Sequence, residues 1–330
     1  MAPRKLNKQQ RNRIRAAQEK TIQDNTDSNH ESPDLDTSVG LVIQHHGKNA
    51  IVENSEGELL DCRVRQNLGS IVCGDEVIYQ HTDNQTQAVI LAIKDRRNVL
   101  VRPDFRRKPK PFAANIDQII IVTATVPEFS PHLLDRYLVV LEYIGLKGFI
   151  VINKTDLVSA DDMDAIQTTM AIYERIGYPL IYSSTKSDHG LEALIQAVSD
   201  KNNILVGQSG VGKSSIINHL IPELDVQVGE LSQANHGKHT TSSTTLYRLR
   251  KGGHLIDSPG VRDFGVWHIE PEQITAGFIE FRPYLGQCKF HNCKHLHEPG
   301  CAVKEAVNTG HISAERLQSY QQMLNENNAG

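Results

Sequence analysis

The sequence lacks the features of a membrane or secreted protein. None of its apolar runs approaches the roughly 18 residues that a membrane-spanning helix needs. The longest, Ile119 to Val126, has the length of a buried strand. The basic amino terminus is not followed by the apolar segment of a secretory signal. We therefore expect a cytoplasmic protein without a membrane partner.

Cysteine is scarce, with five residues in 330. A protein stabilised by disulfide bonds is therefore not expected. Cys62 and Cys73 lie in strand-like sequence and are expected to be small buried side chains.

The other three cysteines lie close together among histidines. The pattern Cys-x4-Cys-x-His-x5-Cys supplies three thiolates and one imidazole, which fill a closed tetrahedral shell. We predict one structural zinc ion (Zn²⁺) here, with His291 and His297 as alternative nitrogen ligands. The predicted ligands are Cys288, Cys293, His295 and Cys301.

Charge of one sign is concentrated at the amino terminus. The first twenty residues hold seven Lys or Arg against one Glu, and residues 24–36 then carry five acidic side chains. With so few apolar residues this segment cannot bury a core, so residues 1–37 are expected to be a disordered tail. Its basic part fits either a solubilising role or contact with a nucleic acid.

Three patterns of hydrophobic residues follow the tail. Short β-rich runs separated by turns over 38–102 predict a small β-barrel, with the oligonucleotide-binding (OB) barrel as one such fold. Residues 103–115, rich in proline and basic side chains, predict a linker. Strands alternating with helices over 116–269 predict a three-layer α/β domain, and residues 270–330 predict a small α-helical domain around the zinc ligands.

A glycine-rich segment follows the predicted strand Ile204 to Val206 and precedes a predicted helix. This context and sequence match a phosphate-binding loop. Glycines let backbone amides turn towards phosphate oxygens, Lys213 is expected to bridge the terminal phosphates, and Ser214 to ligate Mg²⁺. Ser215, which follows, is also expected to bind nucleotide. The loop reads Gly207-Gln208-Ser209-Gly210-Val211-Gly212-Lys213-Ser214.

A second motif, Asn153-Lys154-Thr155-Asp156, ends the predicted strand Phe149 to Ile152. The carboxylate of Asp156 can accept both the ring N1 proton and the exocyclic amine of guanine, whereas adenine offers no matching pair of donors. The motif therefore predicts GTP or GDP. Alone it also fits a turn capped by Asp156. Ser183 and Ser184, one strand later, favour the nucleotide because they are suited to donate a backbone amide to the guanine oxygen.

These two motifs occur in reversed order. In ordinary guanine-nucleotide-binding proteins the phosphate loop comes first, whereas here the base motif precedes it. A pocket at the carboxyl ends of strands depends on which loops meet there, so it survives if the former termini are joined. The sequence predicts a circularly permuted P-loop GTPase domain.

Two further segments are expected to contact the γ-phosphate. Asp257-Ser258-Pro259-Gly260 follows a predicted strand, and we expect Asp257 to hold Mg²⁺ through water and the Gly260 amide to meet the phosphate. The polar loop over 237–244 precedes that strand. In this loop Thr240 or Thr241 is expected to complete the magnesium shell.

The group that orients the attacking water is not evident from these motifs. Val261 occupies the position at which many such hydrolases carry a glutamine. His236, His239 or a group from a partner is expected to replace it, and unstimulated turnover should be slow. Both histidines also fit solvated loop positions.

Taken together, these motifs resemble the circularly permuted ribosome-associated GTPases, the ribosome small subunit-dependent GTPase A family. The resemblance implies an OB barrel, a carboxy-terminal zinc domain, and GTP hydrolysis stimulated by the small ribosomal subunit. It also implies a role in late maturation of that subunit, with its rRNA as a partner. It favours His239 over His236 as the catalytic histidine, acting with Lys213 and Gly260. We expect a monomer.

Two other functions compete with a GTPase whose hydrolysis is coupled to release from the subunit. An RNA-binding module with a largely non-catalytic nucleotide site would not accelerate hydrolysis when ribosomal subunits are added. A metabolic kinase would need an acceptor-substrate site, which the sequence does not show. The intact Lys213, Ser214, Asp257 and Asp156 favour the GTPase.

Overall fold

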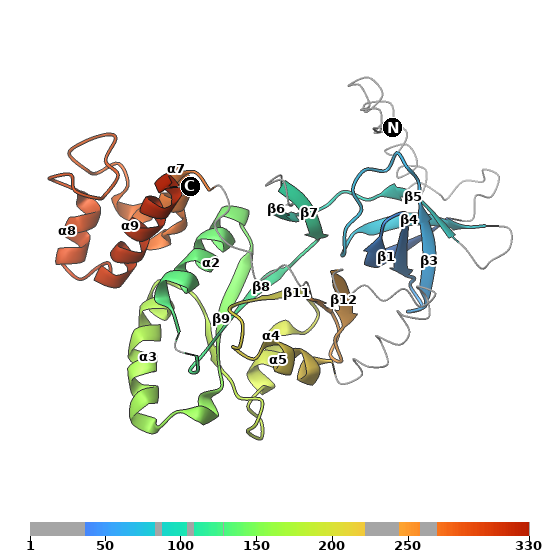
Figure 1. The fold of residues 1–330 in the computed structure, drawn as a ribbon, viewed down its shortest axis with the longest axis horizontal. Coiled ribbons are helices and arrows are strands. Elements are labelled where there is room, and N and C mark those ends of the chain that lie inside the picture. Colours follow the sequence, from blue (N-terminus) through green and yellow to red (C-terminus); the bar gives the residue numbers. More distant parts are fainter. Residues whose placement is uncertain are drawn as a thin grey trace. The chain divides into compact units, whose positions relative to one another are not determined.

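The chain forms two compact units (Figure 1). The structure is a computed structural model, and it describes residues 37–82, 88–103, 109–127, 129–221, 244–257 and 269–329. The first unit contains residues 1–116, 221–249 and 254–259, and the second contains 117–220, 250–253 and 260–330. The predicted amino-terminal tail lies almost wholly outside the described residues.

The first unit contains a closed five-stranded barrel. Its strands pair in the order β1-β2-β3-β5-β4, and β4 pairs back to β1. This order, with β3 and β5 parallel, closes the sheet as in an OB barrel. The strands are β1 (Thr37–His46), β2 (Asn49–Glu53), β3 (Leu59–Val64), β4 (Glu76–His81) and β5 (Ala88–Ile93).

Alternating side chains fill the barrel. Val42, Val52, Val77 and Ile90 are fully buried, as the predicted strands require. Gly40 pairs with Val77 of β4, and β1 begins to pair with β2 at the next residue. A Cβ at Gly40 would collide with the Val52 side chain and the Glu53 carbonyl. Glycine is therefore needed for the close approach of the strands.

Part of the predicted linker is a strand. β7 (Pro109–Ala114) pairs antiparallel with β6 (Val99–Pro103) in a separate two-stranded sheet. The prolines of this segment obscured the strand in the sequence, but an edge strand tolerates residues without an N–H. Residues 109–114 are therefore not an unstructured linker, and residues 104–108 lie outside the described part of the chain.

A second hairpin joins the first unit from far along the chain. β12 (Thr245–Arg248) pairs antiparallel with β13 (His254–Asp257), and Thr245 of β12 also pairs with Gln44 of β1. The sequence predicted β13 but not β12, because Thr245–Arg248 has no run of apolar residues.

The second unit contains a parallel sheet in the order β10-β9-β8-β11. Every residue of β8 is buried, as expected for a central strand covered on both faces. The α/β prediction is confirmed for this unit. The strands are β8 (Gln118–Ala124), β9 (Lys147–Asn153), β10 (Leu180–Tyr182) and β11 (Asn202–Val206).

Helix α2 begins and ends at residues that are typical of helix ends. In α2 the Ser130 hydroxyl accepts a hydrogen bond from the Leu133 amide, Pro131 occupies the first turn, and Gly145 ends the helix in the left-handed conformation. Within the described ranges, no helix combines the length and apolar character needed to cross a membrane. The helices are α2 (Pro131–Ile144), α3 (Ala160–Arg175), α4 (Glu192–Val198) and α5 (Lys213–Leu220).

The C-terminal segment is helical and packs on α2. Figure 1 shows α7 and α9, in orange and red, beside α2. A Cβ at Gly277 of α7 would collide with Val139 of α2, so the two helices approach closely at this point. The elements are α7 (Pro271–Gly277), the short 3₁₀ helix η3 (Ile279–Tyr284), α8 (Ala302–Asn308) and α9 (Ala314–Ala329).

A buried arginine joins this segment to helix α2. Arg316 of α9 is 1% exposed, and its guanidinium lies 2.6 Å from a carboxylate oxygen of Asp135 in α2 and 2.6 Å from one of Glu280 in η3. The Phe278 ring lies 4.3 Å from the guanidinium carbon, and the Tyr173 hydroxyl donates to Asp135. Both carboxylates therefore depend on one cation.

We expect Arg316→Ala to destabilise the protein by about 3–5 kcal/mol, because it leaves two buried carboxylates without their cation. Arg282→Ala is the matched control, since Arg282 pairs with Glu142 at the surface and such pairs contribute about 1 kcal/mol or less. Urea unfolding monitored by circular dichroism measures both losses. Equal losses in the two variants would contradict the role given to Arg316.

Candidate functional site

The base motif lies at the carboxyl end of β9. Asn153 is the last residue of the strand, Lys154 takes a left-handed backbone conformation with φ of 61°, and Thr155–Leu157 form the short 3₁₀ helix η1. The sharp turn after the strand brings Asp156 to the surface while Asn153 stays buried. The side chain of Asn153 is therefore available for contacts inside the protein, and that of Asp156 for contact with a ligand.

Asn153 ties the base motif to the phosphate loop. Its side-chain Nδ2 donates to the Val211 carbonyl at 2.9 Å, and its Oδ1 accepts from the Ser183 hydroxyl at 3.2 Å. A Cβ at Gly212 would collide with this amide group, so only glycine fits. Three loops that are far apart in sequence therefore meet at one buried side chain.

Lys154 makes a second connection between the same loops. Its Nζ donates to the Gly210 carbonyl at 2.5 Å and to the Val126 carbonyl at 2.8 Å. The sequence predicted Lys154 as a nucleotide-binding residue but did not predict these contacts. Every residue has a backbone carbonyl, so the sequence does not reveal which carbonyls accept a hydrogen bond. The lysine holds the loop after β8 and the phosphate loop in place.

Asp156 is held by Ser184. The Ser184 hydroxyl donates to Asp156 Oδ1 at 2.5 Å and accepts from the Lys186 amide at 3.0 Å. The hydrogen bond from Ser184 lowers the pKa of Asp156, so the carboxylate is ionised and can accept two donors from a guanine ring. Asp156 is exposed, so a base can approach its carboxylate from the solvent.

The predicted donation of a serine backbone amide to the guanine oxygen stays a prediction. The Ser183 amide donates to the Ile152 carbonyl within the sheet, and the Ser184 amide donates to the Gly190 carbonyl at 3.2 Å. A guanine oxygen would have to displace that longer bond to receive the Ser184 amide. The two serine hydroxyls also contribute, because they donate to the side chains of Asn153 and Asp156.

The phosphate loop connects β11 to α5. Gly207, Gly210 and Gly212 all have positive φ, a conformation that turns successive amides towards one side of the loop. A Cβ at Gly207 would collide with the Val122 carbonyl of the neighbouring strand β8. Glycine is therefore required both for the backbone conformation and for packing against the sheet.

Lys213 lies inside this loop. Its Nζ donates to the Gly207 carbonyl at 2.7 Å and to the Gln208 carbonyl. The ammonium is thus held by the loop whose amides would surround a phosphate chain, while Ser214 and Ser215 follow in the exposed first turn of α5. A positive charge at the amino end of a helix favours a bound polyanion.

The structure brings the residues of the base motif, the serine pair and the phosphate loop together in the second unit. Asp257 ends β13, in the first unit. Five other predicted residues, with the loop over 237–243, lie outside the described residues, namely His236, His239, Thr240, Thr241 and Gly260.

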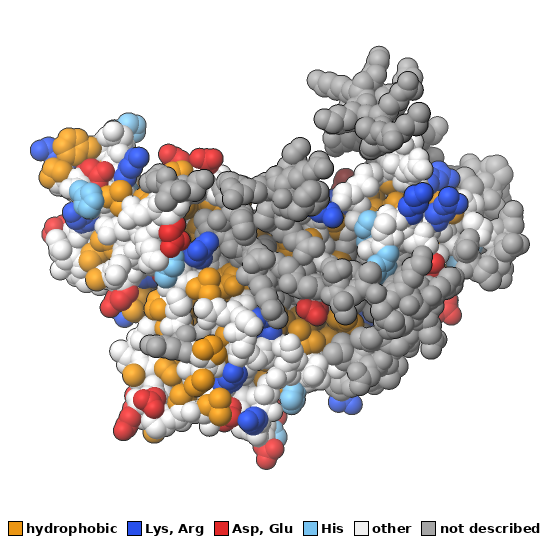
Figure 2. Space-filling view, in the orientation of Figure 1, with side chains coloured by type: hydrophobic (Ala, Val, Ile, Leu, Met, Phe, Trp, Pro, Cys, Tyr) orange, Lys and Arg blue, Asp and Glu red, His pale blue; other side chains and the backbone are white. Residues whose placement is uncertain are grey.

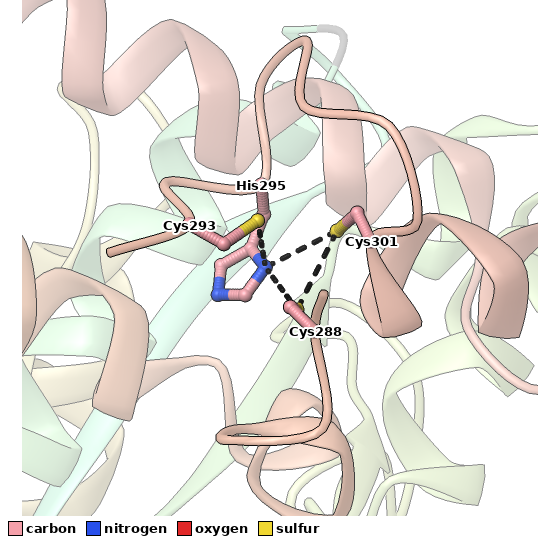
Figure 3. A group of neighbouring side chains, drawn as sticks. All are labelled: Cys288, Cys293, His295 and Cys301. Carbon is pink, nitrogen blue, oxygen red and sulfur yellow. Dashed lines mark hydrogen bonds between the residues drawn. The ribbon is translucent and has the colours of Figure 1, made fainter. Parts of the chain in front are cut away.

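The four predicted zinc ligands form one cluster. Figure 3 shows their side chains pointing towards a common centre, and the four ligand atoms all lie within 4.8 Å of one another. His295 Nδ1 is 3.6 Å from the Cys288 and Cys293 sulfurs and 3.2 Å from the Cys301 sulfur. Tetrahedral zinc with bonds of about 2.0–2.3 Å places its ligands roughly 3.3–3.8 Å apart. The residues therefore fit a zinc ion.

Of the three histidines proposed as the nitrogen ligand, His295 fits best. Burial lowers the pKa of His295, which keeps the ring in the neutral form that binds metals, whereas His291 and His297 are exposed. Glu298 accepts hydrogen bonds from the amides of residues 294, 296 and 297, and these bonds lower its pKa to about 2. Sequence reasoning missed Glu298, because a capping carboxylate in a loop has no distinctive spacing.

The comparison with known protein families identifies the chain. A family model described as RsgA GTPase matches residues 93–267. This chain belongs to the RsgA GTPase family. It is therefore a GTPase, and membership implies GTP or GDP and Mg²⁺ as its ligands.

Curated relatives of this RsgA-family GTPase match nearly its whole length. The "Small ribosomal subunit biogenesis GTPase RsgA" of Haemophilus influenzae strain 86-028NP is 44% identical, with 98% of this chain and 96% of the relative covered. The "Small ribosomal subunit biogenesis GTPase RsgA 1" of Vibrio vulnificus strain YJ016 is 43% identical, with 97% and 93% covered.

Two solved structures share the fold. YjeQ from Thermotoga maritima has a TM-score of 0.71 and 34% identity, and covers 88% of this chain and 98% of its own. YloQ, described as a circularly permuted GTPase, has a TM-score of 0.71 and 31% identity, with 90% and 97% covered. The circular permutation predicted from the motif order is confirmed.

We expect Asp156→Asn to weaken GTP binding by about 100-fold or more, because the carboxamide cannot accept both guanine donors. Xanthosine triphosphate, which has a carbonyl in place of the exocyclic amine, should bind the variant better than GTP does. Calorimetric titration measures both affinities. Asp162→Asn, a matched change at an exposed position of α3, should leave them unchanged. Unaltered base preference in the Asp156 variant would contradict the assignment.

We expect about one zinc ion per chain by atomic absorption, lost in Cys293→Ser together with a lower melting temperature, because a structural zinc site contributes folding energy. Chelation of the wild-type protein should lower the melting temperature in the same way. His291→Ala is the control and should retain the metal. Loss of zinc from that control would show that the ligand set is wrong.

Proposed function

We propose that this protein is a GTP-driven switch that binds the small ribosomal subunit, assists its late maturation and leaves after GTP hydrolysis. The observation that carries the proposal is the joining of the base motif to the phosphate loop through Asn153 and Lys154. One nucleotide can contact both loops, and the protein belongs to a family with relatives named for small-subunit biogenesis. A cytoplasmic monomer is proposed on the same grounds.

Within this proposal, each nucleotide group has a defined contact. Asp156 selects guanine, the amides of the phosphate loop and Lys213 hold the phosphates, and Ser214 and Asp257 bind the magnesium ion with Thr240 or Thr241. The ion, when bound, neutralises charge that develops on the β- and γ-phosphates. The Gly260 amide contacts the γ-phosphate. Binding of the subunit places His239 to orient the attacking water.

A surface of mixed chemistry in the C-terminal segment supports a contact with ribosomal RNA (rRNA). Phe290 is 41% exposed, and Lys289 Nζ lies 5.7 Å from the centre of its ring. Figure 2 shows hydrophobic side chains beside lysine, arginine and histidine side chains over this segment. An exposed aromatic ring can stack on an unpaired base while the cations contact phosphates. The OB barrel supplies a second fold used for oligonucleotides.

We expect purified small subunits, but not large subunits, to accelerate GTP turnover, with Lys213→Ala as the inactive control. His239→Ala should reduce the stimulated rate by about 100-fold, because the water loses the group that orients it. Phosphate release in single and multiple turnovers measures these rates. His236→Ala, a nearby histidine of the same loop, should behave like the wild type.

Two results would count against the proposal. No acceleration by small subunits would favour an RNA-binding module with a largely non-catalytic nucleotide site. Equal stimulation of the wild type and the His239 variant would remove this histidine from the mechanism and leave His236 or a group of the partner to orient the water.

A further inference from the structure

The hairpin of β12 and β13 connects the two segments predicted to contact the γ-phosphate. Residues 237–244 run directly into β12, which begins at Thr245, and β13 ends at Asp257, the first residue of the second segment. Any contact that fixes this hairpin therefore fixes one end of each segment through the covalent chain. The barrel makes such contacts.

We propose that Gln44 of the barrel is a positioning residue for GTP hydrolysis, which acts by holding Thr245 at the start of β12. The proposal rests on the proposed function, and it makes the barrel the part through which a bound RNA alters the GTPase reaction.

The contact is buried and specific. Gln44 Nε2 donates to Thr245 Oγ1 at 3.0 Å, and the two side chains are 9% and 6% exposed. Their Cα atoms are the paired positions between β1 and β12. A buried polar pair of this kind is costly to break, because each side chain would lose a hydrogen bond at a position where water cannot readily replace it.

The strand geometry directs Gln44 to the hairpin. β1 pairs with β4 over residues 37–41, and then with β12 at Gln44. The register between β1 and β2 shifts between Val42 and Gln44, as at a β-bulge. Bulges re-aim a side chain and end a pairing. β1 therefore pairs with β4 up to Leu41 and with β12 at Gln44, the residue that donates to Thr245.

A second contact fixes the far end of β12. Arg248 Nε lies 3.4 Å from Oε1 of Glu53 in β2, and a Cβ at Gly57 would collide with the Arg248 guanidinium. Arg248 is more exposed than the Gln44 pair, so we expect it to contribute less to the coupling. Both ends of the strand are nevertheless attached to the barrel.

The energetic consequence is reciprocal. If RNA bound to the barrel and nucleotide bound to the GTPase site both depend on the position of β12, each must change the affinity for the other by the same factor. We expect a factor of about 5 to 30, within the range typical of coupled sites. Removing the Gln44 contact should bring that factor towards one.

The test is a double-mutant cycle with Gln44→Met and Thr245→Val, which remove one hydrogen-bonding group each and keep the volume. Two ratios are measured for every variant: the GTP turnover with and without small subunits, and the subunit affinity in a non-hydrolysable GTP analogue and in GDP. Each single variant should reduce both ratios by about 5- to 30-fold, and the double variant no further. Asn49→Leu removes an exposed hydrogen bond to Asp61 in the same barrel and should preserve both ratios.

The outcomes separate the alternatives. A merely structural role would lower the melting temperature and the subunit affinity in both nucleotides equally, and would leave the affinity ratio unchanged. Wild-type ratios in both single variants, or additive losses in the double variant, would overturn this inference. They would leave the proposed function intact. A wild-type protein without stimulation would overturn the proposed function. The inference would then stand only if the wild type binds the subunit with different affinities in the GTP analogue and in GDP, and if this difference disappears in both single variants.

Discussion

The hydrogen bond from Asn153 to the Val211 carbonyl is the constraint on which the nucleotide site depends. It joins two loops 58 residues apart, at the ends of two strands that flank β8 in the sheet. The bond depends on where these strands end, and not on which comes first along the chain. A circular permutation therefore preserves it. Lys154 adds a second link to the same loop, and Ser183 and Ser184 orient the two side chains of the base motif.

Two groups of side chains pack together in the C-terminal segment. The four predicted metal ligands lie together in its loop, and the ligand His295 lies against the rings of Phe281 and Tyr320. Phe278 packs on both of those rings and also covers the guanidinium of Arg316. The Cys₃His cluster is thus linked by continuous packing to the ion pair between Arg316 of α9 and Asp135 of α2.

The sequence predicted most of the elements because their signals are local. The strands of the barrel and of the parallel sheet follow from apolar runs and turns. β6, β7 and β12 were missed. Neither β7 nor β12 has an apolar pattern of its own, and each is a strand because a neighbouring strand, β6 or β1, offers hydrogen bonds to its backbone. The sequence of a short segment does not reveal that it pairs with a strand far away in the chain.

By itself, the sequence determined which residues could bind guanine, phosphate and zinc, because those chemistries need particular side chains at particular spacings. Only the tertiary structure decided how these residues are held. The contacts of Lys154 with two carbonyls, of Ser184 with Asp156, of Gln44 with Thr245 and of Arg316 with two carboxylates join segments that are far apart in the chain. Such contacts depend on which strands and helices become neighbours, a property of the packed core that no local pattern of residues records.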